Sequence, residues 1–159
     1  MNDSAILALA LLTTMFAAWA GLVLGVSFLS ARAKFRAPSI SLRVALDVGR
    51  QTFRALSRTE MLLAIMASAT CVAIANWLFF VGLAVVWSVI VAERFWLLPV
   101  LDLRAGIRMT GRTLRLSYHH TLFARLEMAK VVVLLICSGI GLVTLSQKLI
   151  EGNRECPYI

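Results

Sequence analysis

The sequence predicts an all-α membrane protein in which four transmembrane helices form a bundle. Of its 159 residues, 60% are hydrophobic, and the mean hydropathy of +0.87 lies far above that of ordinary soluble domains. The apolar residues are grouped into stretches that are long enough to cross a bilayer. Basic residues are instead concentrated in two connecting segments, a pattern that fits an even number of spans. We expect one integral membrane domain over residues 1–159.

The first apolar stretch runs from Ala5 to Leu29 without a charged residue. At about 1.5 Å per residue it is long enough to cross roughly 30 Å of hydrocarbon, so we expect a span at about 5–29. We expect this segment to be retained rather than cleaved as a signal peptide, because its leader contains Asp3 and no basic residue. The stretch is also too long for the apolar core of a signal peptide.

The next apolar region, Met61 to Leu101, is interrupted only by the pair Glu93-Arg94. It is too long for one span, so we expect two spans joined by a tight turn near 76–80. A last apolar run ends near Leu145. These patterns predict three further spans, at about residues 61–78, 80–101 and 122–146.

The expected topology follows from the two basic connections, 31–60 and 102–121. The first connection holds Arg32, Lys34, Arg36, Arg43, Arg50, Arg54 and Arg58, and Arg104, Arg108, Arg112, Arg115 and Arg125 lie between Asp102 and Glu127. Basic residues in short loops stay on the cytoplasmic side of a membrane. We therefore expect both connections to be cytoplasmic and both termini to lie outside. A three-span arrangement would place the two connections on opposite sides.

These basic residues favour contact with a membrane over contact with nucleic acid. They flank the spans, and no aromatic residues are interleaved with them as base stacking would require. Apolar residues also recur at helical spacing between Leu42 and Arg58, which predicts an amphipathic helix at the interface. We expect no nucleic-acid partner, and we expect anionic lipid headgroups to contact Arg43, Arg50, Arg54, Arg104, Arg108 and Arg112.

Three carboxylates, Glu60, Glu93 and Glu127, stand next to or inside the apolar runs, in the cytoplasmic half of the expected spans. A carboxylate at such a depth needs a proton, a counter-charge or a metal ion. Lys130 follows Glu127 by three residues, so the two side chains share a helix face. The candidate polar cluster therefore comprises Glu60, Glu93, Arg94, His120, Glu127 and Lys130.

Several chemistries fit this cluster. An ion-pair network that fixes helix packing needs nothing more, whereas a proton or ion relay also uses a membrane-embedded Glu beside a His. Metal binding would draw on Glu60, Glu93, His120 and Glu127, but the Glu-x-x-His spacing of di-iron bundles is absent. The only two histidines are adjacent, which argues against haem.

No phosphate loop, nucleophile elbow or zinc signature supports a familiar enzyme, and we expect no cofactor.

The two halves of the chain also share a short sequence pattern. Arg58-Thr59-Glu60-Met61 corresponds to Arg125-Leu126-Glu127-Met128, which predicts a two-fold repeat of a span-loop-span unit.

Small residues form two helix-packing ladders that fit the bundle interior or a seam between copies: Ala17, Gly21 and Gly25, and Ala67, Cys71 and Ala75. Cys156, in the expected outer tail, is a candidate for pairing between chains.

Several short runs occur between Gly21 and Leu142, namely Gly25–Phe28, Lys34-Phe35, Ala37–Ser39, Val44–Arg50, Leu98–Arg104, His119-His120 and Glu127. Together they resemble a family of small four-span bacterial inner-membrane proteins with no defined activity, and the resemblance covers most of the chain over that range. It implies a bacterial inner (plasma) membrane. We expect a non-catalytic protein associated with the membrane or with a complex, as a homo-oligomer or beside a membrane-protein partner. The alternative is a metal, redox or ion-translocating protein that uses the buried Glu/His cluster.

Overall fold

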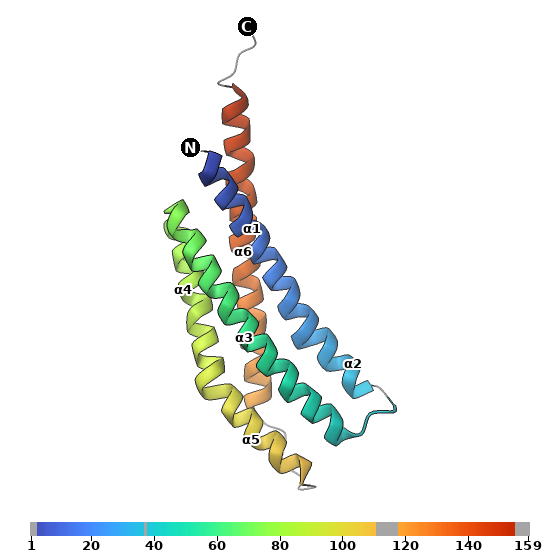
Figure 1. Cartoon of the computed structure of the whole chain (residues 1–159). Helices are drawn as coiled ribbons and strands as arrows, with labels where there is room; N and C mark the ends of the chain where they lie inside the picture. The colour runs from blue at the N-terminus through green and yellow to red at the C-terminus, as the bar shows by residue number, and fades with distance from the viewer. Residues whose placement is uncertain (1–2, 37, 111–117, 155–159) are drawn as a thin grey trace.

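The computed structural model describes residues 3–36, 38–110 and 118–154, and helices account for almost all of them. Within these residues, four helical stretches are long and apolar enough to cross a membrane: Ser4–Lys34, Leu42–Ile74, Trp77–Met109 and Tyr118–Glu151. Figure 1 shows them packed side by side. The structure thereby confirms the all-α class and the four-helix bundle, and the chain is an integral membrane protein. Two candidate residues, Arg112 and Cys156, lie outside the described residues.

Two of the four stretches change helix type along their length. The first consists of α1 (Asp3–Val23), the π-helical segment η1 (Leu24–Ser30) and α2 (Ala31–Arg36). The third consists of α4 (Trp77–Ala92), the π-helical segment η2 (Glu93–Leu97) and α5 (Leu98–Met109). The second and fourth stretches are the single helices α3 (Leu42–Ile74) and α6 (Tyr118–Arg154).

The ends of α3 show why the chain turns where it does. Ser41 caps the start of the helix, where its hydroxyl accepts a hydrogen bond from the backbone N–H of Val44 at 3.4 Å. The amphipathic residues 42–58 then continue without a break into the span, as one helix of 33 residues. At the far end Ala75 adopts a left-handed conformation with φ of 52°, which reverses the chain. Asn76 then caps α4 by accepting a hydrogen bond from Leu78 N at 3.0 Å.

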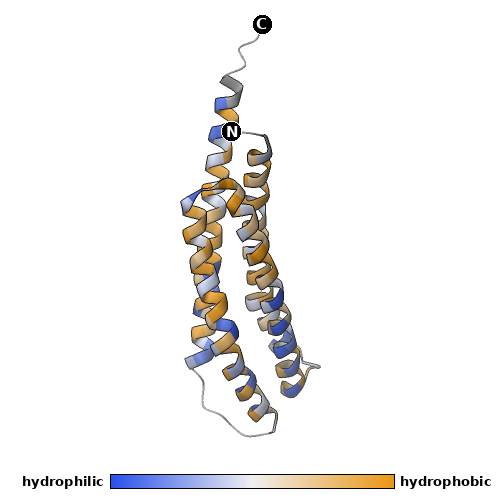
Figure 2. Ribbon diagram, turned by 60° about the vertical axis from the view of Figure 1, so that its left-hand side comes forward, coloured by the Kyte–Doolittle hydropathy of each residue, from blue (hydrophilic) through white to orange (hydrophobic). Residues whose placement is uncertain are grey.

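The bundle has two chemically different ends. The start of α1 and the end of α6 lie at one end, together with the turn between α3 and α4, and we call this the terminal end (Figure 1). The end of α2, the start of α3 and α5 lie at the other, which we call the basic end. Figure 2 shows the hydrophilic residues of the helices gathered toward that end, below a mainly hydrophobic middle.

An apolar core fills the bundle toward the terminal end. Its largest members include Leu9, Phe16, Phe79 and Leu134, which come from α1, α4 and α6. The helices α1 and α6 are in tight contact at Gly141, where a Cβ atom would collide with the hydroxyl of Thr13. The contact between these two helices is therefore packed too tightly for added side-chain volume at Gly141.

The two ladders of small residues differ in their surroundings. Ala67 and Cys71 are fully buried in the core, so their ladder packs inside the bundle. Ala17 and Gly21 are exposed on the outer face of α1, and a Cβ on Gly21 would meet no other atom. Large apolar side chains such as Leu62, Met66 and Leu135 are exposed on the same kind of outer surface, which suits contact with lipid.

Candidate functional site: a buried cluster around Lys130

The ammonium group of Lys130 lies at the centre of a cluster of carboxylates inside the bundle. It is 2.7 Å from Oε1 of Glu60, 2.8 Å from Oε2 of Glu93 and 3.2 Å from Oε1 of Glu127. These glutamates belong to α3, to η2 and to α6. An ammonium group carries three N–H donors, so one donor is available for each carboxylate. The Lys130 side chain has no exposed surface, and those of the three glutamates are at most 5% exposed.

The first span supplies two neutral donors to the same cluster. The indole N–H of Trp19 donates a hydrogen bond to Oε1 of Glu60 at 3.2 Å. The hydroxyl of Ser27, in η1, donates to Oε2 of Glu127 at 3.2 Å. All four spans therefore meet in one polar network, and each contributes at least one side chain to it.

The charges of this network do not balance when every group is ionised. Three carboxylates surround one ammonium group, which leaves two negative charges in excess. The other oxygen of Glu93, Oε1, is buried and accepts no hydrogen bond from the described part of the chain. An uncompensated charge in an apolar interior is strongly unfavourable. The cluster therefore has to take up protons or a cation to become neutral.

The cluster lies well inside the bundle rather than at its surface. Glu93 follows the 16 residues of α4, so it lies about 24 Å along the helix from the turn at the terminal end. The apolar core occupies that distance. On the opposite side, Ser27 also lines a cavity of about 550 Å³ at the basic end. The polar network is thus closed toward one end of the bundle and borders a cavity toward the other.

Both π-helical segments of the described chain contribute to the network. Glu93 is the first residue of η2, and Ser27 lies in the middle of η1. A π-helical turn widens a helix and is found often at functional sites, because the inserted residue redirects the side chains around it. The sequence carries no periodicity signal for such a turn.

The remaining members of the candidate cluster lie elsewhere. The guanidinium of Arg94 donates to the hydroxyl of Ser57 at 3.4 Å and forms no ion pair with a glutamate of the network. His120 is exposed near the start of α6 and lines the cavity at the basic end. The structure therefore brings together Glu60, Glu93, Glu127 and Lys130 from the candidate set.

The basic residues that we expected at the lipid interface have mixed surroundings. Arg50 and Arg54 both bind Asp102, with Arg50 Nε 3.2 Å from Oδ1 and Arg54 Nε 3.0 Å from Oδ2. Arg104 and Arg108 line the cavity, whereas Arg43 is exposed at the start of α3. Part of the basic stripe is thus used to join α3 to α5 through partly exposed ion pairs.

The geometry also bears on metal binding. One oxygen from each of Glu60, Glu93 and Glu127 lies within 4.8 Å of the others, a spacing at which three carboxylates can hold an ion. The Lys130 ammonium already occupies the space between them. A metal ion would have to displace that group, so the arrangement favours protons over a metal as the compensating charge.

Sequence reasoning missed Trp19 and Ser27. Both lie in an apolar stretch without charge, and a single Trp or Ser in a span is ordinarily a packing or surface residue.

Comparison with family models, with curated proteins and with solved structures finds no match for this chain.

Proposed function

We propose that this protein is a proton-handling membrane protein, in which Glu60, Glu93, Glu127 and Lys130 form the proton-binding site. The observation that supports this proposal is the excess of buried carboxylates over the single ammonium group. Such a site is neutral only when it holds two protons in addition to the charged lysine. Carboxylates at membrane depth commonly serve proton relays.

The cavity at the basic end supports a route for those protons. Ser27 lines it and also donates to Glu127, so a hydroxyl separates the cavity from the buried carboxylate. A hydroxyl both donates and accepts hydrogen bonds, which suits it to pass a proton onward. Toward the terminal end, the buried hydroxyls of Thr13 and Ser138 both donate to backbone carbonyls, so release of a proton there requires a change in helix packing.

A non-catalytic role for the cluster is the second candidate. It is favoured by the contact of all four spans with one network, which fixes the helices relative to one another. In that role the two protons stay bound permanently, and the protein acts through a membrane or complex partner.

Infrared difference spectroscopy in lipid nanodiscs separates these candidates. The spectrum is recorded while the pH is stepped across the neutral range, for the wild type, for Glu93→Gln and for Glu151→Gln. We expect the wild type to show a buried carboxylic acid band that changes with pH, and Glu93→Gln to lose a large part of that change. The Glu151 side chain is 64% exposed at the end of α6, so its variant controls for loss of a carboxylate and should match the wild type.

The same variants are then tested in proteoliposomes that contain a pH-sensitive dye. Proton flux in the wild type that falls at least about tenfold in Glu93→Gln, and not in Glu151→Gln, supports proton transfer through the site. Carboxyl bands that do not respond to pH in the wild type would leave only the non-catalytic role.

We also propose that the basic end faces the cytoplasm of a bacterial inner membrane. Arginines are concentrated at that end, on α2, at the start of α3 and on α5, which supports this orientation. Ser39 is exposed between α2 and α3, and a Ser39→Cys variant that also carries Cys156→Ser should react with a membrane-impermeant thiol reagent only after the cells are opened. Labelling of intact cells from the periplasmic side would reverse the orientation.

A further inference from the structure

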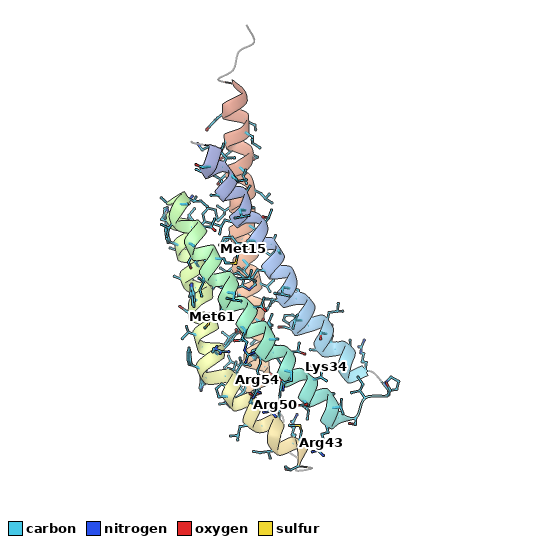
Figure 3. The ribbon with its side chains drawn as sticks, in the orientation of Figure 1. Met15, Lys34, Arg43, Arg50, Arg54 and Met61 are labelled. Atoms are coloured by element: carbon cyan, nitrogen blue, oxygen red, sulfur yellow. The ribbon has the colours of Figure 1, made fainter. Side chains whose placement is uncertain are left out.

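The cavity at the basic end is formed by all four spans. η1 and α2 contribute one part of its wall, α3 and α5 contribute most of the rest, and the start of α6 completes it. Figure 3 labels Lys34 and Arg50, which lie in this region of the molecule. The volume of about 550 Å³ falls within the range of about 300 to 1,000 Å³ that ligand sites in proteins occupy.

The wall of the cavity combines apolar and basic side chains. The apolar part includes three aromatic rings, those of Phe28, Phe53 and Phe123. One carboxylate, that of Asp102, is outnumbered by six basic side chains in the same wall, namely Arg32, Lys34, Arg36, Arg50, Arg104 and Arg108. A cavity with this composition is complementary to a molecule that has an anionic group and a hydrocarbon part.

Three of the basic side chains are available to an anionic group. Asp102 is already bound by Arg50 from within the cavity and by Arg54 from outside it. Arg32, Arg36 and Arg104 form no ion pair with a residue that the structure describes. Guanidinium groups bind phosphate oxygens through paired hydrogen bonds, and they do so better than lysine because their planar fork matches the phosphate.

We propose that this cavity binds one anionic phospholipid from the adjoining leaflet. The phosphate lies at Arg32, Arg36 and Arg104, and the upper part of the acyl chains lies against Phe28, Phe53 and Phe123. The occupant is a lipid rather than a soluble anion because the aromatic wall needs an apolar partner. Basic pockets between transmembrane helices bind anionic headgroups in this way. The proposal differs from surface contact with headgroups, because the lipid enters the bundle.

Native mass spectrometry of the protein in a neutral detergent tests this assignment. The purified protein is titrated with phosphatidylglycerol, or with phosphatidylcholine that has the same acyl chains. We expect one tightly retained phosphatidylglycerol and at least about tenfold weaker retention of phosphatidylcholine, because each basic residue near an anionic headgroup strengthens binding several-fold.

Two triple variants isolate the role of the cavity. Arg32→Gln with Arg36→Gln and Arg104→Gln removes the proposed phosphate site, and retention of phosphatidylglycerol should fall at least about tenfold. The matched control is Arg43→Gln with Arg58→Gln and Arg125→Gln, which removes the same charge from exposed residues outside the cavity wall. Its retention should stay within about twofold of the wild type.

A third variant blocks the cavity without changing its charge. Ala105 lines the cavity, so Ala105→Trp fills part of it and should abolish retention while the helical circular dichroism stays unchanged. This variant tests the proposal even when the arginine variant fails to fold. Equal retention of the two lipids, equal losses in both triple variants, full retention by Ala105→Trp, or displacement of the lipid by inorganic phosphate would each overturn the assignment.

Discussion

The two halves of the bundle are built on different principles. Toward the terminal end, apolar side chains from all four spans form one continuous core, and α1 and α6 touch at Gly141. Toward the basic end, buried residues such as Ala45 and Phe123 stand outside that core, around a cavity lined by arginines. The carboxylate and ammonium network lies at the boundary. The terminal half holds the helices together, and the basic half provides a cavity and charged side chains that suit a ligand.

The largest effect is expected at the boundary between the halves, from Lys130→Met. This change leaves three buried carboxylates without their shared counter-charge, and loss of one partner of a buried ion pair costs about 3–5 kcal/mol. The free energy of unfolding, measured in mixed micelles with increasing SDS, should fall by that amount. Lys148→Met is the control, because Lys148 forms only an exposed ion pair with Glu151 and its loss should cost less than about 1 kcal/mol. Equal losses in the two variants would contradict a central role for Lys130.

A smaller effect is expected in the terminal half, from Gly141→Ala. The added methyl group collides with the hydroxyl of Thr13, and overpacking of this kind costs about 1–3 kcal/mol. Gly139→Ala is the matched control, since its methyl group meets no other atom. The same unfolding assay should show Thr13→Ala restoring stability to Gly141→Ala. A double variant no more stable than Gly141→Ala would show that the two helices do not touch there.

The smallest effect is expected in the basic half, from Asp102→Asn. Asp102 binds Arg50 and Arg54, but its side chain is 23% exposed, and partly exposed ion pairs contribute about 1 kcal/mol or less. Unfolding should therefore change little. Retention of phosphatidylglycerol should instead rise, because the single negative group in the cavity wall is removed. Reduced retention would show that Asp102 orders the arginines that the lipid needs.

The sequence was sufficient to predict the four spans and their bundle, because length and hydropathy determine which segments cross a bilayer. It also allowed the depth of Glu60, Glu93 and Glu127 to be counted along each helix. The direction in which a side chain points around the helix axis cannot be worked out from residue spacing in the same way, because a π-helical segment turns the side chains that follow it. For that reason the sequence could not separate Glu93, which binds Lys130, from its neighbour Arg94, which binds Ser57.

The cavity was beyond sequence reasoning for a related cause. Regular spacing of arginines in residues 42–58 predicts a basic stripe, but not whether the stripe faces solvent or another helix. The pairing of Arg50 and Arg54 with Asp102 depends on α5 lying beside α3, a long-range contact with no local signal. The two-fold repeat that the matching segments around Glu60 and Glu127 indicate remains a prediction. The lysine that both glutamates bind has no counterpart in the first half, where Leu63 occupies the corresponding position.

The position of Lys130 in the last span has a consequence for biosynthesis. A chain is made from its N-terminus, so the hairpin of α3 and α4 leaves the ribosome before the lysine does. Glu60 and Glu93 then have no ammonium partner, and neutral carboxylic acids are the least costly form in which they can enter the bilayer. When α6 then inserts into the membrane, it brings both Lys130 and Glu127, which lie on this same helix. The ion pair of Glu127 and Lys130 is neutral, so the two protons that Glu60 and Glu93 carry into the membrane are the same two that the finished cluster needs to be neutral.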